Sequence, residues 1–260
     1  MQIEGTVALV TGANRGIGSA FVDALLERGA AKVYAAVRDP ATLTTADPRV
    51  QSVRLDVSDA ERVAAVAGEL GDVQLVVNNA GIAHPGTPAT ASLEGARAEL
   101  EVNFLGLVAM TQAFAPVLAA NGGGAFVNVL SVASWAASPL LSTYAASKAA
   151  AWSFSNSARI ELARQGSQVV GVHVGYVDTD LTAALDVEKI EPAAVAASAL
   201  DAVEAGEPEA VVDEVSRQVK AGLSDDHRLL YPQIALEFAA LFATTPDLAA
   251  AAAGSRSRED

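Results

Sequence analysis

The chain has 260 residues, of which 51% are hydrophobic and 18% charged, and its formal net charge is −14. This composition provides for a sizeable core and excludes a disordered chain, while the acidic surplus disfavours nucleic acid and anionic lipid as partners. The absence of cysteine excludes disulfides, thiolate metal sites and cysteine nucleophiles, and it fits a cytoplasmic protein. We expect no signal peptide and no membrane span, because glycine, proline or charge interrupts each apolar run before the ~20 residues that a span needs.

Short valine-rich runs alternate with longer alanine-rich segments along the chain. The runs predict strands at residues 7–10, 32–37, 50–55, 73–77, 125–130 and 168–174, with a short seventh strand at 210–212. The alanine-rich segments predict helices at 17–28, 59–70, 94–120 and 143–165, and one that begins near Pro192. Alternating strands and helices indicate right-handed crossovers and a parallel sheet. The predicted fold is α/β, a single-domain Rossmann-type doubly wound parallel sheet with helices on both faces, over residues 1–248, followed by a frayed tail at 249–260.

Residues 7–18 have the pattern of a strand, a glycine-rich turn and the start of a helix. Gly12 permits a tight turn, Gly16 lets the backbone approach a pyrophosphate, and Gly18 lets the helix pack closely on the strand. The N-terminus of the helix then offers unpaired N–H groups and a partial positive charge to phosphates. The spacing G-x-x-x-G-x-G differs from the commoner G-x-G-x-x-G, so the turn by itself also fits an ordinary glycine-rich loop.

Four further features follow this turn along the chain. They are Asn103 in a predicted helix, Ser131 thirteen residues before Tyr144, the Y-x-x-x-K pattern of Tyr144 and Lys148, and Asn78-Asn79-Ala80-Gly81 after the fourth strand. With T-G-x-x-x-G-I-G at 11–18, they resemble the classical short-chain dehydrogenase/reductase family over roughly residues 5–205. The resemblance implies an oxidoreductase that uses a nicotinamide cofactor, with Asn103, Ser131, Tyr144 and Lys148 as its catalytic residues.

The chain departs from the family pattern in two places. The usual Pro-Gly after the sixth strand is Val174-Gly175, which leaves that loop less rigid. The usual C-terminal glycine-rich strand is replaced by residues 213–220, which are polar and predicted to be helical. Because that end of the family chain often forms part of a tetramer contact, its absence leaves tetramerisation open. The resemblance still implies a homodimer, with the helices at 94–119 and 143–164 paired across a two-fold axis.

The chemistry expected of the catalytic residues follows from their types and spacing. Tyr144 and Lys148 are four residues apart, so on a helix they share one face, although such a pair is by itself usually an ordinary surface pair. A neighbouring cation favours phenolate, so we expect Lys148 to lower the pKa of Tyr144 from its ordinary value near 10. Tyr144 would give a proton to a developing alkoxide, and Ser131 would hold the substrate oxygen. By the resemblance, Asn103 orders a water that passes protons to Lys148.

The end of the second strand bears on cofactor choice. A carboxylate at this strand tip binds the ribose 2′-hydroxyl of NAD, whereas an arginine is needed for the 2′-phosphate of NADP. Here Val37 takes the carboxylate position and Arg38 follows, with Arg15 as a second cation, so NADP(H) is expected over NAD(H). Asp39 supports the competing interpretation, since an inward carboxylate would repel the phosphate. The residues expected to bind the cofactor are Gly12, Asn14, Arg15, Gly16, Ile17, Gly18, Arg38, Asp56, Val57, Asn79, Ala80, Gly81, Tyr144, Lys148, Gly175, Val177 and Thr179.

The segment after the sixth strand bears on the substrate. Only residues 180–191 separate Thr179 from Pro192, which is too short for a large lid, so we expect an open pocket. Its expected lining is Ser131, Trp135, Tyr176 and Leu181, although Trp135 could equally cover the core. No arginine or lysine marks a clamp for an anionic substrate, which favours a neutral, partly apolar ketone or aldehyde.

Two other functions stay open at this stage. The first is reduction of a 3-ketoacyl group on an acyl carrier, for which an acidic surface is a poor dock. The second is a non-catalytic protein that binds NADPH as a sensor, because a fold alone does not give a function. The presence of all four catalytic residue types argues against the second. The three histidines show no metal-ligand spacing, so no metal is expected, and His173 within an apolar strand is expected to be a packed residue.

Overall fold

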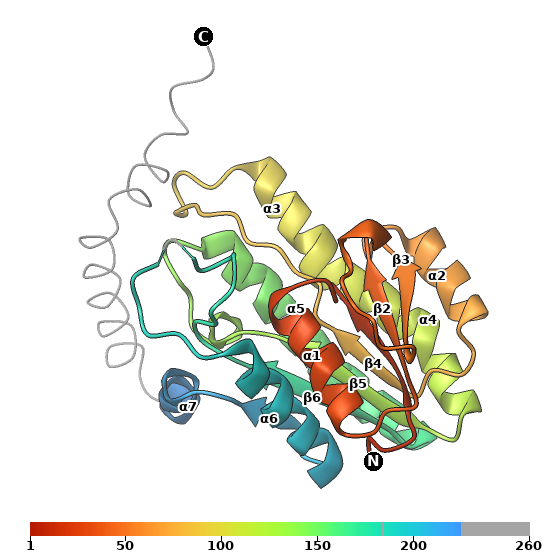
Figure 1. Ribbon diagram of the computed structural model, residues 1–260. Coiled ribbons are helices and arrows are strands. Elements are labelled where there is room, and N and C mark those ends of the chain that lie inside the picture. Colours follow the sequence, from red (N-terminus) through yellow and green to blue (C-terminus); the bar gives the residue numbers. More distant parts are fainter. Residues whose placement is uncertain (184, 225–260) are drawn as a thin grey trace.

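The computed structural model describes residues 1–183 and 185–224, which form one parallel sheet with helices on both of its faces (Figure 1). The seven strands lie in the order β3-β2-β1-β4-β5-β6-β7. Their bounds are β1 Val7–Thr11, β2 Lys32–Val37, β3 Val50–Arg54, β4 Leu75–Asn78, β5 Gly124–Val129, β6 Ser167–His173 and β7 Glu209–Val211. The order reverses between β1 and β4, and in such sheets ligands bind at the carboxyl ends of the strands beside this reversal.

This topology confirms the predicted doubly wound α/β fold. The frayed tail expected at 249–260 lies outside the described residues, as does the proposed domain boundary at 248.

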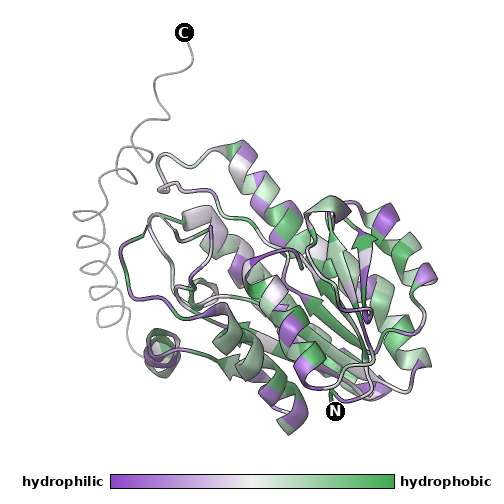
Figure 2. Ribbon diagram, viewed as in Figure 1, coloured by the Kyte–Doolittle hydropathy of each residue, from purple (hydrophilic) through white to green (hydrophobic). Residues whose placement is uncertain are grey.

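Two layers of helices bury the two faces of the sheet. The helices are α1 Gly16–Glu27, α2 Ala60–Glu69, α3 Leu93–Leu100, α4 Gly106–Ala120, α5 Ser142–Leu162, α6 Pro192–Ala205 and α7 Glu214–Ala221. Val10 of β1 packs with Phe21 of α1 on one face, whereas its neighbour Leu9 packs with Val66 of α2 and Phe114 of α4 on the other. Because both faces are covered, the central strands β1, β4 and β5 are mostly apolar, as the hydropathy colours of Figure 2 show, whereas the edge strand β3 is partly exposed and carries polar residues.

The predicted helix at 94–120 is helical throughout but not uniform. A π-helical turn at Glu101–Leu105 joins α3 to α4, and Asn103 is the buried residue of that turn. Single π turns inside α-helices occur frequently at functional sites. By length and composition alone, Leu93–Ala120 is long and apolar enough to cross a membrane. Its buried side chains Met110, Phe114 and Leu118 pack against the sheet, which is the position of a core helix.

Candidate active site

The glycine-rich turn lies between β1 and α1, and each of its glycines meets a different constraint. Gly12 has φ +64° and Gly16 has φ +53°, a backbone region that favours glycine. A Cβ added to Gly18 would lie 2.0 Å from the carbonyl oxygen of Gly12, so the first turn of α1 packs against the strand with no room for a side chain. This is the close packing that the sequence predicted for Gly18.

Asn79 joins the end of β4 to this turn. Its backbone N–H donates to Thr11 Oγ1 over 3.0 Å, and its side-chain Nδ2 donates to the carbonyl oxygen of Thr11 over 2.9 Å. The strands on either side of the reversal in strand order are therefore tied together at their carboxyl ends. The backbone at the N-terminus of α1 is left facing the space above them.

A single cleft of about 1060 Å³ runs along this edge of the sheet. Its volume is at the upper end of the range for small-molecule and cofactor sites. Most of the residues expected to bind cofactor line it, and Ser131 and Leu181 do so as well. The expected residues that line the cleft are Gly12, Asn14, Arg15, Gly16, Ile17, Arg38, Asp56, Val57, Asn79, Ala80, Gly81, Ser131, Tyr144, Lys148, Gly175, Val177, Thr179 and Leu181. A glycine cradle at a helix N-terminus, opening on an elongated cleft, fits a dinucleotide.

Ser131, Tyr144 and Lys148 meet at the carboxyl end of β5. Ser131 follows the strand and caps a short 3₁₀ helix, Val132–Ser134, with its hydroxyl accepting from the Ala133 N–H over 3.1 Å. Tyr144 and Lys148 both project from α5, and the Ser131 hydroxyl acts to lower the pKa of Tyr144. Lys148 Nζ donates to the carbonyl oxygen of Val129 over 2.8 Å and lies 5.8 Å from the centre of the Tyr144 ring. The fold thus brings together the three side chains that the motif spacing predicted to be neighbours.

Burial decides the proton affinities of this group. Burial raises the pKa of Tyr144 to about 12. The Ser131 hydroxyl acts in the opposite direction, and the charge of Glu99 adds a smaller increase. Burial also lowers the pKa of Lys148 to about 8. The expectation of a lowered pKa for Tyr144 is therefore wrong, because removal of the phenol from water raises it. At neutral pH the phenol keeps its proton.

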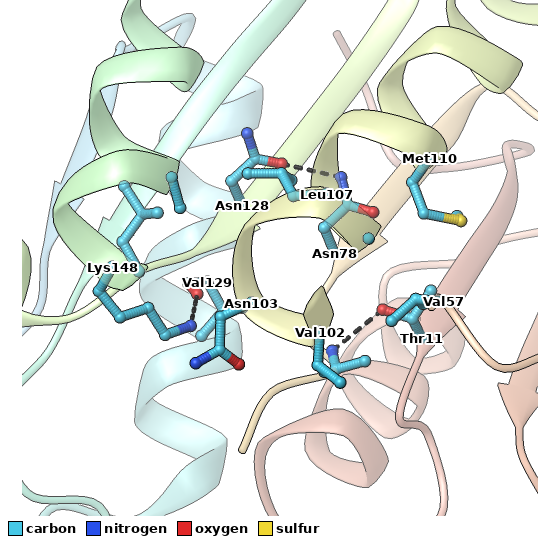
Figure 3. A pocket seen from close by; sticks show the side chains of 14 residues that line it. Thr11, Val57, Asn78, Val102, Asn103, Leu107, Met110, Asn128, Val129 and Lys148 are labelled. Atoms are coloured by element: carbon cyan, nitrogen blue, oxygen red, sulfur yellow. Dashed lines mark hydrogen bonds between the residues drawn. The ribbon is translucent and has the colours of Figure 1, made fainter. Parts of the chain in front are cut away.

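Asn103 binds the loop that follows β4. Its Oδ1 accepts from the Ile82 N–H over 2.9 Å, and its Nδ2 donates to the carbonyl oxygen of Ile82 over 2.8 Å and to Ser147 Oγ over 2.9 Å. The side-chain amide is thus occupied by protein partners. Asn103 and Lys148 also line a small interior cavity of about 20 Å³, which can hold roughly one water (Figure 3). Asn78 also lines this small cavity, and its buried Oδ1 has no hydrogen-bond partner among the described residues. The relay of protons from Lys148 through a water at Asn103 remains a prediction.

The residues expected to choose between cofactors lie at the β2 end of the cleft. Asp39 Oδ1 accepts from the Ala41 N–H over 3.1 Å and so caps a short 3₁₀ helix, Pro40–Thr42. Arg38 contributes to lowering the pKa of Asp56, after hydrogen bonds from Ser58. Across the cleft, Arg15 Nη1 lies 2.5 Å from Asp180 Oδ2, and both side chains are exposed. The carboxylate of Asp39 is thus occupied by its own loop, while Arg15 already has a partner.

Four of the expected site residues do not line the cleft: Gly18 packs against Gly12, Asn103 lines the small cavity, and the other two lie elsewhere. Neither Trp135 nor Tyr176 is among the residues that line the cleft. Trp135 stacks on His173, with ring centres 3.6 Å apart, and meets Trp152 edge to face. The sequence left open whether Trp135 lines the pocket or covers the core. In the structure it packs on the sheet.

Asp213, which the sequence pattern did not single out, joins α7 to the cleft. Asp213 Oδ2 accepts from the Gly175 N–H over 2.7 Å, while Oδ1 accepts from the Ser216 N–H at the start of α7. An aspartate three residues before a serine at the start of a polar helix is an N-cap signal that the sequence does contain. Its contact with Gly175, 38 residues away, could be found only from the fold.

Comparison with known proteins relates the chain to dehydrogenases and reductases. The family model described as short chain dehydrogenase matches residues 6–189. Cis-4-hydroxycyclohexanecarboxylate dehydrogenase of Sinomonas cyclohexanicum is 37% identical over 69% of this chain and 76% of its own length. A 3-oxoacyl-(acyl-carrier-protein) reductase of Vibrio cholerae is 33% identical over 73% of this chain and 80% of its own. A crystal structure of a short chain dehydrogenase from Burkholderia cenocepacia in complex with NADP is 40% identical, with a TM-score of 0.87, and the match covers 90% of this chain and 99% of that one.

Proposed function

The chain belongs to the short-chain dehydrogenase family, and from this premise we propose that it interconverts a carbonyl compound and an alcohol with NADP(H) as its cofactor. The observation that carries the proposal is the meeting of Ser131, Tyr144 and Lys148 at the wall of the cleft, where Tyr144 and Lys148 stand on the same helix and Lys148 Nζ lies 5.8 Å from the centre of the Tyr144 ring. Besides a hydride, reduction of a carbonyl group needs a proton donor and a group that holds the carbonyl oxygen. Tyr144 and Ser131 can supply these two.

The proposed roles follow from the positions of these groups. Ser131 holds the substrate oxygen, and Tyr144, which is protonated at neutral pH, donates its phenolic proton to that oxygen as negative charge develops on it. Lys148, fixed by Val129, places a cation behind the phenol. A bound nicotinamide supplies or accepts the hydride. The glycine turn and the N-terminus of α1 would hold its pyrophosphate.

A preference for NADP(H) is supported by the charges at the β2 end of the cleft. Arg38 follows Val37, which takes the position where a carboxylate would bind a 2′-hydroxyl. Asp39 is held in a cap on its own loop, so its charge is engaged there. The Burkholderia relative was crystallised with NADP. Arg15 would have to leave Asp180 to reach a 2′-phosphate, so we assign the larger share of discrimination to Arg38.

We expect NADPH to bind at least about tenfold more tightly than NADH, because one charged hydrogen bond to the 2′-phosphate contributes roughly 1.5–3 kcal/mol. Arg38→Ala should remove most of this difference and leave NADH binding unchanged, and Val37→Asp should favour NADH. Fluorescence titration of the three proteins with both cofactors measures the effect. Equal affinity of the parent for NADH and NADPH would show that Asp39 binds the ribose instead.

The substrate class is inferred from the remaining cleft lining. Of the described residues that line the cleft, the lysines and arginines are Arg15, Arg38 and Lys148, and each has a place in the cofactor or proton chemistry above. This leaves no cation for a substrate carboxylate or phosphate. Ala98, Val102 and Leu181 supply apolar surface to the same cleft. We therefore propose a neutral, partly apolar ketone or aldehyde.

The experiment that tests the function is NADPH oxidation with a panel of neutral aryl and cyclic ketones, a keto acid and a 3-oxoacyl thioester. Turnover with the neutral ketones supports the proposal. Turnover with the thioester alone would instead favour the chemistry named for the Vibrio relative. Tight NADPH binding without turnover of any compound would indicate a sensor that binds the cofactor and performs no chemistry.

We also propose that the chain forms a homodimer through α3 and α5. Leu93 and Leu100 of α3 and Ile160 of α5 are exposed apolar side chains, and Ile160 is 78% exposed. α3 packs against α5, so a two-fold axis beside them would bury both helices at once. We expect a dimer by light scattering at micromolar concentration and a shift towards monomer in Ile160→Glu. A monomeric parent would refute this.

A further inference from the structure

A buried histidine lies directly behind the serine of the site. His173, the last residue of β6, is fully buried. Its Nδ1 lies 3.3 Å from the backbone carbonyl oxygen of Ser131, which can only accept, so Nδ1 carries the proton in this contact. The same ring stacks on Trp135, with ring centres 3.6 Å apart and planes 14° apart. The imidazole thus contacts both ends of the turn that presents the Ser131 hydroxyl, and the proposed function gives it no role.

A carboxylate lies on the other side of this ring. Glu209 of β7 places Oε1 3.5 Å from His173 Nε2. The carboxylate is itself fixed, since Lys220 of α7 lies 2.5 Å from Oε2 and Trp152 Nε1 donates to Oε1 over 3.4 Å. His173 first, and then Lys220, lower the pKa of Glu209 to about 2, so this group stays ionised throughout the neutral range. Arg159 of α5 adds a further positive charge nearby.

We infer that His173, which lies between Ser131 and Glu209, is a positioning residue that sets the orientation of Ser131 towards the substrate oxygen. The inference rests on the proposed function, because it assigns His173 a part in the same reaction. It also gives the unusual C-terminal region a role, since Lys220 connects α7 through Glu209 and His173 to the site.

The physical basis is the set of contacts that hold the Ser131 turn beside β6. Backbone hydrogen bonds from Leu130 to Val172 and from Val132 to Val174 hold its first residues beside β6. Between these two bonds, the Ser131 carbonyl oxygen accepts from the Ser134 N–H over 3.0 Å within the turn and contacts His173 Nδ1 from the β6 side, so the imidazole is the side chain that fixes this carbonyl relative to the sheet. A misplacement of about 1 Å in a reacting group can lower a rate about 100-fold. Loss of the imidazole should therefore act on turnover and not on the cofactor end of the cleft.

The first test separates turnover from binding. His173→Leu should lower kcat by ~10- to 100-fold while KM and the Kd for NADPH stay within about twofold. His173→Asn should recover most of kcat, because its Nδ2 can donate to the same carbonyl oxygen. Val172→Ala, a truncation at the neighbouring buried position on the other face of β6, serves as the matched control and should keep parental kcat. Equal loss in His173→Leu and His173→Asn, or equal loss in the control, would overturn the inference.

The second test asks whether the effect passes through the Ser131 hydroxyl. In a Ser131→Ala background, His173→Leu should lower the residual kcat no further, since the group that it positions is absent. Fully additive losses would contradict this. A parent that reduces no compound of the panel sinks the proposed function, whereas an active parent with an active His173→Leu sinks only the positioning role. A crystal structure of His173→Leu should show the 131–135 turn displaced by about 0.5 Å or more, and an unmoved turn would overturn the inference independently of activity.

Discussion

Tyr144→Phe is expected to lower kcat for ketone reduction by about 10²- to 10⁴-fold while NADPH affinity stays within about twofold. The substitution removes only the hydroxyl, so the ring keeps its place on α5. The phenol has a pKa of about 12 and is therefore protonated at neutral pH, ready to donate. Without it the nearest hydroxyl is that of Ser131, which can hold the oxygen of the substrate but is a much weaker acid.

The measurement is steady-state NADPH oxidation with the best ketone of the panel, together with fluorescence titration of NADPH. Tyr176→Phe provides the matched control, because it removes the same hydroxyl from a tyrosine that does not line the cleft, and it should keep parental turnover. A Tyr144→Phe enzyme within tenfold of the parent would show that another group donates the proton.

The part of the site that could be predicted from the sequence consists of residues at strand ends. Gly12, Asn79 and Ser131 follow β1, β4 and β5, and parallel strands of one sheet bring their carboxyl ends to one edge. Tyr144 and Lys148 could be placed because four residues on a helix return to one face. In each case a short local pattern fixes the position once the sheet is parallel.

The misplaced residues depend on contacts between distant segments. Trp135 is four residues after Ser131, but the side of the turn on which it lies is set by His173 of the neighbouring strand. Arg15 lines the cleft as expected, but its contact with Asp180 joins residues 165 apart in the sequence and could not be read from the motif. The direction of the Tyr144 pKa shift was missed for a related reason, because it is set by burial and the motif shows only the charge of Lys148.

Lys148→Met is expected to lower both turnover and NADPH affinity, and at the same time to stabilise the fold at neutral pH. The charge and the donors of the ammonium are lost beside Tyr144, and by family resemblance this lysine also reaches the nicotinamide ribose. A charged hydrogen bond contributes roughly 1.5–3 kcal/mol, so NADPH affinity should fall by about tenfold or more. We expect kcat to fall by at least about 100-fold, because proton transfer loses its neighbouring cation.

The gain in stability follows from the depressed pKa of Lys148, about 8 in the fold against 10.5 as its ordinary value. Below pH 8 the lysine is charged in both the folded and the unfolded chain, so the full penalty of burying the charge is present. Between about pH 8 and 10.5 only the unfolded chain binds the proton, and the unfolding free energy of the parent rises by about 1.4 kcal/mol per pH unit relative to the variant. At pH 7 the variant should therefore be more stable by ~1–3 kcal/mol, after loss of the hydrogen bond to Val129, and this advantage should vanish between pH 8 and pH 10.5.

Urea unfolding of parent and variant at pH 7, 8.5 and 10 measures this difference, with Lys189→Met as a control whose side chain does not line the cleft. The control should change neither the activity nor the pH dependence of stability. A Lys148→Met protein that loses activity but shows the same stability difference at every pH would mean that the lysine is well solvated. In that case the ammonium would act from an open surface rather than from a buried site, and its effect on Tyr144 would be weakened by added salt.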